Sequence, residues 1–259
     1  MRSVCGGLKP KKQMETAEYQ RMAAVQKSHW WYRATRALLR QFLAPAFHTR
    51  KTSTRLRFLD AGCGTGATGA WLGEFGSVTA LDAAPEALEF YAAQHPGAEL
   101  IRGEIESIPL PDQSVDAALC VTVLYHANVI QPERAVRELA RVVQPGGWVC
   151  LLEPGVRSLR RGHDRETHTA RRFSLGDLKD LAQQADLEIL YATGAYAFLI
   201  PPAWLKAQLE TQKSLSDTAQ NASGLFGLFS FVAWLERQIL RCAALPFGLS
   251  VLVIARKKH

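Results

Sequence analysis

Short apolar segments alternate with amphipathic segments along most of this chain, and the alternation predicts strands that are followed by helices. The expected strands cover residues 56–62, 77–82, 98–103, 115–123, 146–154, 187–198 and 249–257. The expected helices cover residues 15–47, 66–75, 85–94, 133–143, 174–185 and 203–243. Because nearly all-apolar strands alternating with helices are typical of a parallel sheet that is covered on both faces, the pattern predicts an α/β fold.

Composition supports a folded enzyme-sized domain and says little about partners. The 259 residues are 47% hydrophobic, which is enough for a well-packed α/β core, and the 21% of charged residues excludes wholesale disorder. The net charge of +7 indicates an anionic partner only weakly, since residues 9–12 and 256–258 carry part of it near the ends of the chain.

The cysteines and the apolar segments point to a cytoplasmic protein. There are five cysteines, an odd number, without a C-x-x-C pair, which favours reduced thiols over a disulfide framework or a zinc site. No signal peptide is recognisable at the start, and the apolar run GLFGLFSFVAWL (224–235) is too short to span a bilayer.

A glycine-rich loop is the clearest chemical signal. The segment RFLDAGCGTGATG (57–69) contains the spacing G-x-G-x-x-G at Gly64, Gly66 and Gly69, which is typical of dinucleotide-binding loops but is weak evidence alone. Asp60 favours another ligand, because a carboxylate directly before the loop would repel a pyrophosphate. It would suit a ligand that carries positive charge, and it argues against a nicotinamide oxidoreductase.

Four motifs in order resemble the class I S-adenosylmethionine-dependent methyltransferases. They are LDAGCGTG, ALDAAPEAL, GEIESIPLPDQSVDAALC and LARVVQPGGWVCLLEP, and they span roughly residues 56–154. HWWYRATR near the start and the Arg-rich segment 157–172 resemble a bacterial branch of small-molecule methyltransferases. The resemblance implies a Rossmann-like, seven-stranded, mostly parallel sheet with helices on both faces and an antiparallel last strand.

The expected domain organisation follows from this resemblance. Residues 1–50 would form an N-terminal arm and helical cap, and residues 51–200 the S-adenosylmethionine-binding core. Residues 201–245 would form a helical lid, and residues 246–259 the strand that completes the sheet.

The resemblance also implies a set of cofactor contacts. The implied residues are Tyr32, Arg36, Asp60, Gly62, Gly64, Gly66, Asp82, Ala83, Glu104, Ile105, Val121 and Thr122. The glycines would let the backbone approach the methionine part of S-adenosylmethionine, and Asp60 would balance its cationic end. Asp82 would accept from both ribose hydroxyls, and Ala83 would lie against the adenine.

The remaining contacts of this set are less regular. Glu104 stands where the family usually has Asp; it would accept from the adenine amino group, with the Ile105 N–H beside it. Val121 and Thr122 would lie beside the sulfonium. Glu106 could take part in the site, or it could be a solvated residue after the strand; the sequence favours neither role.

An N-terminal cap over the cofactor would come from three residues of HWWYRATR. They are Trp31, Tyr32 and Arg36, with Arg36 pairing the cofactor carboxylate. For Trp30 we expect packing of the helix onto the sheet instead.

Candidate catalytic residues follow the fourth strand and lie in the Arg-rich segment. Tyr125 and His126 in VLYHAN are placed to meet an acceptor, and a neutral imidazole could take a proton, although a structural role for His126 is slightly favoured. His163 and His168 are further candidates. Asp and His in such a charged loop are more often solvated, so we expect no metal. The arginines of residues 157–172 could clamp an anionic group or face solvent.

These features predict a methyltransferase that acts on an oxygen or nitrogen of a small, partly hydrophobic acceptor and releases S-adenosylhomocysteine. Whether the acceptor is also anionic stays open at this point. The apolar residues 203–243 would form a lid that lines the acceptor pocket. Two alternatives are a homodimer interface, in place of a monomer, and a peripheral contact with a membrane. A nucleic-acid methyltransferase is the first rival, but the run [DNS]-P-P-[YFW] is missing after the fourth strand. A non-catalytic cofactor-binding protein is the second.

Overall fold

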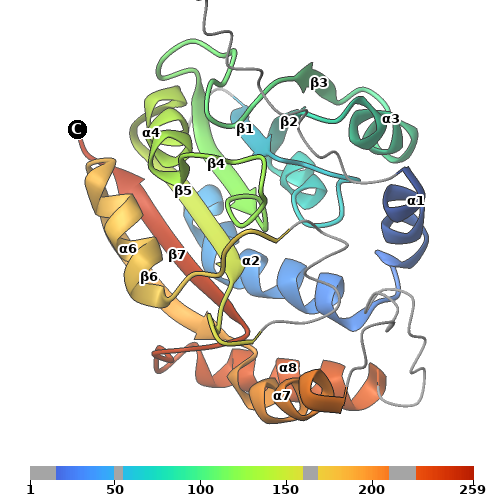
Figure 1. Cartoon of the computed structure of the whole chain (residues 1–259). Helices are drawn as coiled ribbons and strands as arrows, with labels where there is room; N and C mark the ends of the chain where they lie inside the picture. The colour runs from blue at the N-terminus through green and yellow to red at the C-terminus, as the bar shows by residue number, and fades with distance from the viewer. Residues whose placement is uncertain (1–15, 50–54, 160–168, 210–225) are drawn as a thin grey trace, which may run out of the picture.

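The fold is a seven-stranded mixed sheet between two helical layers (Figure 1). The computed structural model describes residues 16–49, 55–159, 169–209 and 226–259. The strands are β1 (Leu56–Ala61), β2 (Gly76–Asp82), β3 (Glu99–Arg102), β4 (Val115–Val121), β5 (Val143–Pro154), β6 (Leu187–Ala195) and β7 (Ser250–Lys257). Their order in the sheet is β3-β2-β1-β4-β5-β7-β6.

The strand directions confirm the predicted fold class. β1 pairs in parallel with β2 and β4, β2 with β3, and β4 with β5. β7 runs antiparallel to both of its neighbours, β5 and β6. The carboxyl ends of β1 to β6 therefore lie at one edge of the sheet, which is where α/β folds bind their ligands.

Helices cover both faces of the sheet. The α-helices are α1 (Thr16–Val25), α2 (Trp30–Thr49), α3 (Pro85–Gln94), α4 (Pro132–Val142), α6 (Leu175–Gln184), α7 (Ile200–Leu209) and α8 (Phe226–Ile239). Short 3₁₀ helices occur at η1 (Ala70–Glu74) and η2 (Ala197–Leu199). None of the helices in the described ranges is long and apolar enough to cross a bilayer.

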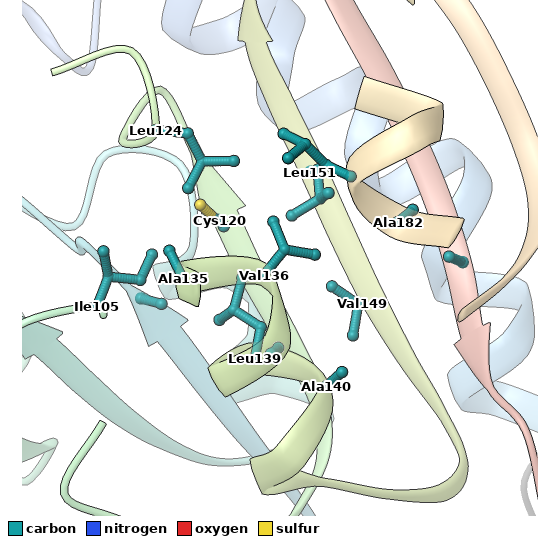
Figure 2. Close-up of a cluster of buried hydrophobic side chains, with 14 of the residues drawn as sticks. Ile105, Cys120, Leu124, Ala135, Val136, Leu139, Ala140, Val149, Leu151 and Ala182 are labelled. Atoms are coloured by element: carbon teal, nitrogen blue, oxygen red, sulfur yellow. The ribbon is translucent and has the colours of Figure 1, made fainter. Parts of the chain in front are cut away.

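Two apolar layers hold the helices to the sheet. On one face, α4 packs against β5 and α6 packs against β6 and β7, with buried side chains such as Val136, Leu139 and Ala182 (Figure 2). On the other face, α2 and α8 pack with residues that include Leu39 and Leu240. β4 lies in the middle of the sheet and is buried along its whole length, which explains why its sequence does not alternate.

Several predicted elements have other bounds. The helix expected over 15–47 is two helices, α1 and α2, with a break at 26–29. The helix expected over 66–75 is wrong at its start: Gly66 has φ +83°, a left-handed conformation that cannot begin a helix, and only η1 forms.

The C-terminal part differs in the same way. The strand predicted over 187–198 ends at Ala195, because Tyr196 adopts a left-handed φ of 61° and turns the chain into η2. The helical segment predicted over 203–243 is represented by α7, which begins at Ile200, and by α8, which ends at Ile239.

Candidate cofactor and acceptor site

Three acidic residues come together at the carboxyl edge of the sheet. Asp60 lies near the end of β1, Asp82 ends β2, and Glu104 follows β3. Their charges act on one another: the charge of Asp82 contributes to a raised pKa at Asp60, and that of Glu104 to a raised pKa at Asp82. The structure therefore brings together the three acids that the sequence predicts.

Asp60 is the most unusual of the three. It is 2% exposed, and burial, followed by the nearby charge of Asp82, raises its pKa to about 7. Its Oδ2 atom has no hydrogen-bond partner among the described residues. A buried carboxylate oxygen without a partner is costly, so this group fits a site that receives a positively charged ligand.

Asp82 holds the glycine loop in place. Its Oδ2 accepts the N–H of Gly64 at 2.9 Å, and its Oδ1 accepts the N–H of Ala84 at 2.9 Å. Burial raises the pKa of Asp82, and these N–H donors oppose the shift. Because each carboxylate oxygen has a second lone pair, Asp82 can hold the loop and still accept from hydroxyl groups.

Glycine is required at Gly62, Gly64 and Gly66 of the predicted loop for different structural reasons. All three have left-handed φ values. A Cβ on Gly62 would lie 2.4 Å from Val123, and one on Gly66 would lie 2.8 Å from the His95 ring, so protein packing excludes it. At Gly64 a Cβ would meet nothing within 4 Å. The space above Gly64 and the open oxygen of Asp60 fit a cationic nucleoside such as S-adenosylmethionine.

The N-terminal helices are tied to this loop by polar contacts. Arg36 Nη1 donates to the carbonyl of Ala67 at 2.7 Å and to that of Gln26 at 3.2 Å. Thr65 Oγ1 donates to Gln26 Oε1 at 2.6 Å. Burial lowers the pKa of Arg36. Arg36 thus binds the backbone of the glycine loop, and its pairing with a ligand carboxylate stays a prediction.

The aromatic residues of HWWYRATR pack in two directions: Trp31 and Tyr32 pack on each other, and Trp30 packs toward α8. Tyr32 is buried and Trp31 packs edge-on against it, with ring centroids 5.0 Å apart. Trp30 packs on Tyr196 and Phe229, at 5.6 and 5.7 Å, and so joins α2 to α8.

Tyr19 of α1 is a site residue that the sequence interpretation missed. It is buried against Ala84 and Ala87, directly after Asp82 in the chain. Burial raises its pKa, and the charges of Asp82 and Glu86 add to the shift. Its helical spacing with Met22 marks only an apolar face, so no local signal distinguishes it from a core residue.

Glu153 was also missed, although it lies within a quoted motif. It is fully buried near the end of β5 and accepts the N–H groups of Val123 (3.0 Å), Leu124 (2.9 Å) and Tyr125 (3.2 Å). Burial raises its pKa to about 8, and the three N–H donors oppose the shift. Glu153 therefore fixes the loop that carries Tyr125 and His126.

That loop begins with a strained residue. Thr122 has φ 54°, which is uncommon for a residue with a branched side chain, and its N–H donates to the carbonyl of Leu152 at 2.7 Å. The preceding Val121 is buried in the core. Such strain is typical of functional sites.

His126 is held by its own loop. Its Nδ1 accepts the N–H of Asn128 at 3.1 Å, so a neutral ring carries its proton on Nε2 and presents a donor there. His126 also forms a short antiparallel bridge with Thr169, and the Tyr125 carbonyl accepts the N–H of Ala170 at 3.0 Å. The end of the Arg-rich segment is thereby placed beside VLYHAN.

Arg171 ties the two segments together further. Its Nη1 donates to the carbonyl of Val129 at 2.8 Å, and its charge acts on Glu153. His163 and His168 lie outside the described residues. Within the described ranges, no group of three His, Cys, Asp or Glu side chains could hold a metal ion.

The other predicted residues occupy varied positions near the edge. Ala83 and Glu104 are half-buried, while Ile105 is a buried core residue. Glu106 accepts the N–H groups of Ile130 (3.1 Å) and Gln131 (2.8 Å) just before α4. Glu106 therefore binds the start of a helix, where a carboxylate is favourable.

Sequence comparison identifies the central part of the chain. Residues 59–151 match the family model described as "Methyltransferase domain". An uncharacterized methyltransferase of Mycobacterium tuberculosis is 43% identical over 97 residues, which cover 37% of this chain and 39% of that relative. The malonyl-[acyl-carrier protein] O-methyltransferase of Pectobacterium atrosepticum is 40% identical over 97 residues, 37% of this chain and 38% of that relative. The similarity thus spans about two fifths of each relative's length.

Structure comparison extends the likeness over most of the fold. A SAM-dependent methyltransferase of Methanosarcina mazei superposes with a TM-score of 0.52 at 22% identity, covering 83% of this chain and 97% of that chain. The [4+2]-cyclase SpnF has a TM-score of 0.52 at 20% identity, covering 83% and 80%. These likenesses show the fold, and the sequence match includes Asp60, Asp82 and the glycine loop. Residues 59–151 therefore resemble a methyltransferase domain in sequence, and the fold around them is similar to that of S-adenosylmethionine-dependent methyltransferases.

Proposed function

We propose that this protein transfers a methyl group from S-adenosylmethionine to an oxygen or nitrogen atom of a small, partly hydrophobic acceptor. The observation that carries the proposal is the buried Asp60 carboxylate, whose Oδ2 lacks a partner among the described residues at the carboxyl edge. A cationic ligand would complete it, whereas a pyrophosphate would be repelled.

Each part of the site has a role in this proposal. S-adenosylmethionine supplies a methyl group on a sulfonium, which a nucleophile displaces in line. Asp82 would accept from the ribose hydroxyls, and Gly64 provides the open space for the methionine part. Glu104 and Ile105 would serve the adenine. Tyr19 would cover the bound nucleoside, because it packs on Ala84 and Ala87, which follow Asp82 in the chain.

The acceptor would bind beside the loop that Glu153 holds. Tyr125 and His126 lie on this loop, next to the end of the Arg-rich segment. Positioning an acceptor opposite the sulfonium supplies most of the rate enhancement that such a displacement needs. The name of the Pectobacterium relative gives it an oxygen acceptor, which supports oxygen as the first class of acceptor to test.

Calorimetry with S-adenosylmethionine, S-adenosylhomocysteine and NADH tests the cofactor assignment. We expect binding of the first two and none of NADH. Asp82→Ala should lower the affinity by at least about 100-fold, because it removes charge-assisted hydrogen bonds and loosens Gly64. Asp180→Ala, an exposed acid of α6, is the matched control. Unchanged affinity in Asp82→Ala contradicts the ribose assignment.

A second experiment tests catalysis separately from binding. Release of S-adenosylhomocysteine is measured against a panel of hydroxyl, carboxyl and amine acceptors, together with mass spectrometry of co-purified ligands. Cofactor binding without product from any acceptor would favour a non-catalytic protein. The [4+2]-cyclase SpnF is similar in fold, so the fold alone does not decide between methyl transfer and another activity.

A further inference from the structure

The helices that follow β6 carry a concentrated apolar surface. We call it the α7–α8 apolar face, and each of its large side chains exposes more than a third of its area. Its residues are Phe198, Trp204, Leu205, Leu228, Phe231, Trp234, Leu235 and Ile239. Isolated exposed apolar residues need no explanation, but a group of this size on η2, α7 and α8 does.

Helix α8 is fixed with this face outward. Leu228, Phe231 and Leu235 are spaced three and four residues apart, so they lie on one side of the helix. The opposite side is anchored in the fold: Ala233 is buried, and the buried Glu236 accepts the N–H groups of Tyr196 and Phe198. Helix α8 is therefore packed against the rest of the fold by one side, and its apolar side remains exposed to solvent.

A basic border lies along the same helix. Arg237 lies one turn after Trp234 in α8, and Arg241 lies two residues beyond the end of α8. With Arg40 and His48 they line an open groove of about 630 Å³ beside α2 and α8. Arg40 is paired with Glu74. Arg237 donates to the carbonyl of Ala37, and Arg241 donates to the side-chain amide oxygen of Gln41. Among the described residues, neither guanidinium forms an ion pair with a carboxylate.

We propose that the α7–α8 apolar face docks on an anionic lipid surface. Tryptophan and phenylalanine beside unneutralised arginines are the composition that binds a bilayer interface, where the rings enter the acyl boundary and the guanidinium groups meet the headgroups. A second copy of this chain, itself at +7, would add like charge to the same border.

Within the ranges that the structure describes, no other segment covers the face. The segment 210–225 between α7 and α8 lies outside the described residues, and its large apolar side chains are Leu215 and Leu225. The other described parts of the chain leave the face exposed.

Docking there would place the carboxyl edge of the sheet near the bilayer. β6 ends at Ala195 and leads directly through η2 into α7, and both α7 and α8 contact η2 (Figure 1). A hydrophobic acceptor could then reach the candidate site from the membrane. The docking inference itself does not depend on the proposed reaction.

Vesicle co-sedimentation of the full chain tests this inference without any methyl transfer. We expect binding to phosphatidylcholine vesicles that contain phosphatidylglycerol, weaker binding to phosphatidylcholine alone, and loss of binding at high salt. The double variant Phe231→Ser/Trp234→Ser should weaken binding by at least about tenfold, because it removes two large apolar side chains. Leu100→Ser, on the opposite edge strand β3, is the matched control.

Charge reversal tests the basic border independently. Arg237→Glu/Arg241→Glu should abolish the preference for anionic vesicles, whereas Arg137→Glu on the exposed side of α4 should not. Thermal unfolding of every variant confirms that it is folded. The inference is overturned if the folded protein ignores anionic vesicles, or if the serine variant binds them unchanged. It is also overturned if sedimentation equilibrium shows a dimer that this variant dissociates while vesicles bind nothing.

Discussion

Gly69 lies directly against the carboxylate of Asp60: a Cβ on Gly69 would stand 2.1 Å from Oδ2 and 2.5 Å from Oδ1 of that side chain. The third glycine of the spacing G-x-G-x-x-G therefore leaves room for the carboxylate of Asp60, which precedes the loop. The relationship joins two residues nine positions apart into one structural unit, and it makes the position of Asp60 sensitive to a single methyl group.

Replacing Gly69 by alanine should displace Asp60 and weaken binding of S-adenosylmethionine. We expect at least about a tenfold loss of affinity by calorimetry, since the added Cβ cannot be accommodated without moving the carboxylate. Gly73→Ala is the control, because Gly73 lies in the 3₁₀ helix that begins directly after Gly69 and a Cβ there meets nothing within 4 Å. Equal affinities of the two variants would show that the contact has no bearing on the ligand.

Cofactor affinity should rise with pH through about pH 7. Asp60 has a pKa raised to about 7 in the folded protein, so below that pH a proton must leave before the carboxylate can balance a cation. The expected slope approaches about tenfold per pH unit below the pKa and vanishes above it. Isothermal titrations between about pH 5.5 and about pH 8.5, roughly 1.5 units on either side of the pKa, measure it.

Asp60→Asn should remove most of this dependence, because the titrating group is gone. The ligand's own ionisation is common to both proteins and cancels in the comparison. The same carboxyl destabilises the ligand-free fold as pH rises from about 4 to 7, since the folded state retains a proton that the unfolded chain has released. A variant with the parental pH profile would contradict the role of Asp60.

Glu153→Gln should destabilise the fold by about 1–3 kcal/mol. The amide keeps one acceptor oxygen but presents a donor to the N–H of Tyr125, which is left without a partner. Urea unfolding measures the loss, and Glu89→Gln on the exposed side of α3 is the control. If Glu153 positions the acceptor loop, turnover should fall while affinity for S-adenosylmethionine changes less.

His126→Ala should lower turnover by less than tenfold. The reason is that Nδ1 accepts the Asn128 N–H, so neutral His126 presents a donor and braces the loop. Steady-state rates with a saturating acceptor measure the effect. A loss of about 10²–10⁴ with the fold intact would identify His126 as a general base.

The strand–helix alternation, the parallel core and the acids that end its strands could all be predicted from the sequence. These follow from local patterns: apolar runs of strand length, glycines in a short loop, and Asp60, Asp82 and Glu104 at comparable places in successive units. Since parallel strands end at one edge, their positions in the chain were enough to predict that they meet.

Only the tertiary structure decided what holds that edge together. Glu153 and Tyr19 act on residues far from them in sequence, and nothing local distinguishes Glu153 from another strand-end acid or Tyr19 from another core aromatic. The break between α1 and α2 and the 3₁₀ helix at 70–74 depend on packing against the glycine loop, which outweighs helix propensity. The outward direction of the α7–α8 apolar face was likewise decided by the burial of Glu236 beneath it, because an apolar run alone does not say which of its sides the fold will cover.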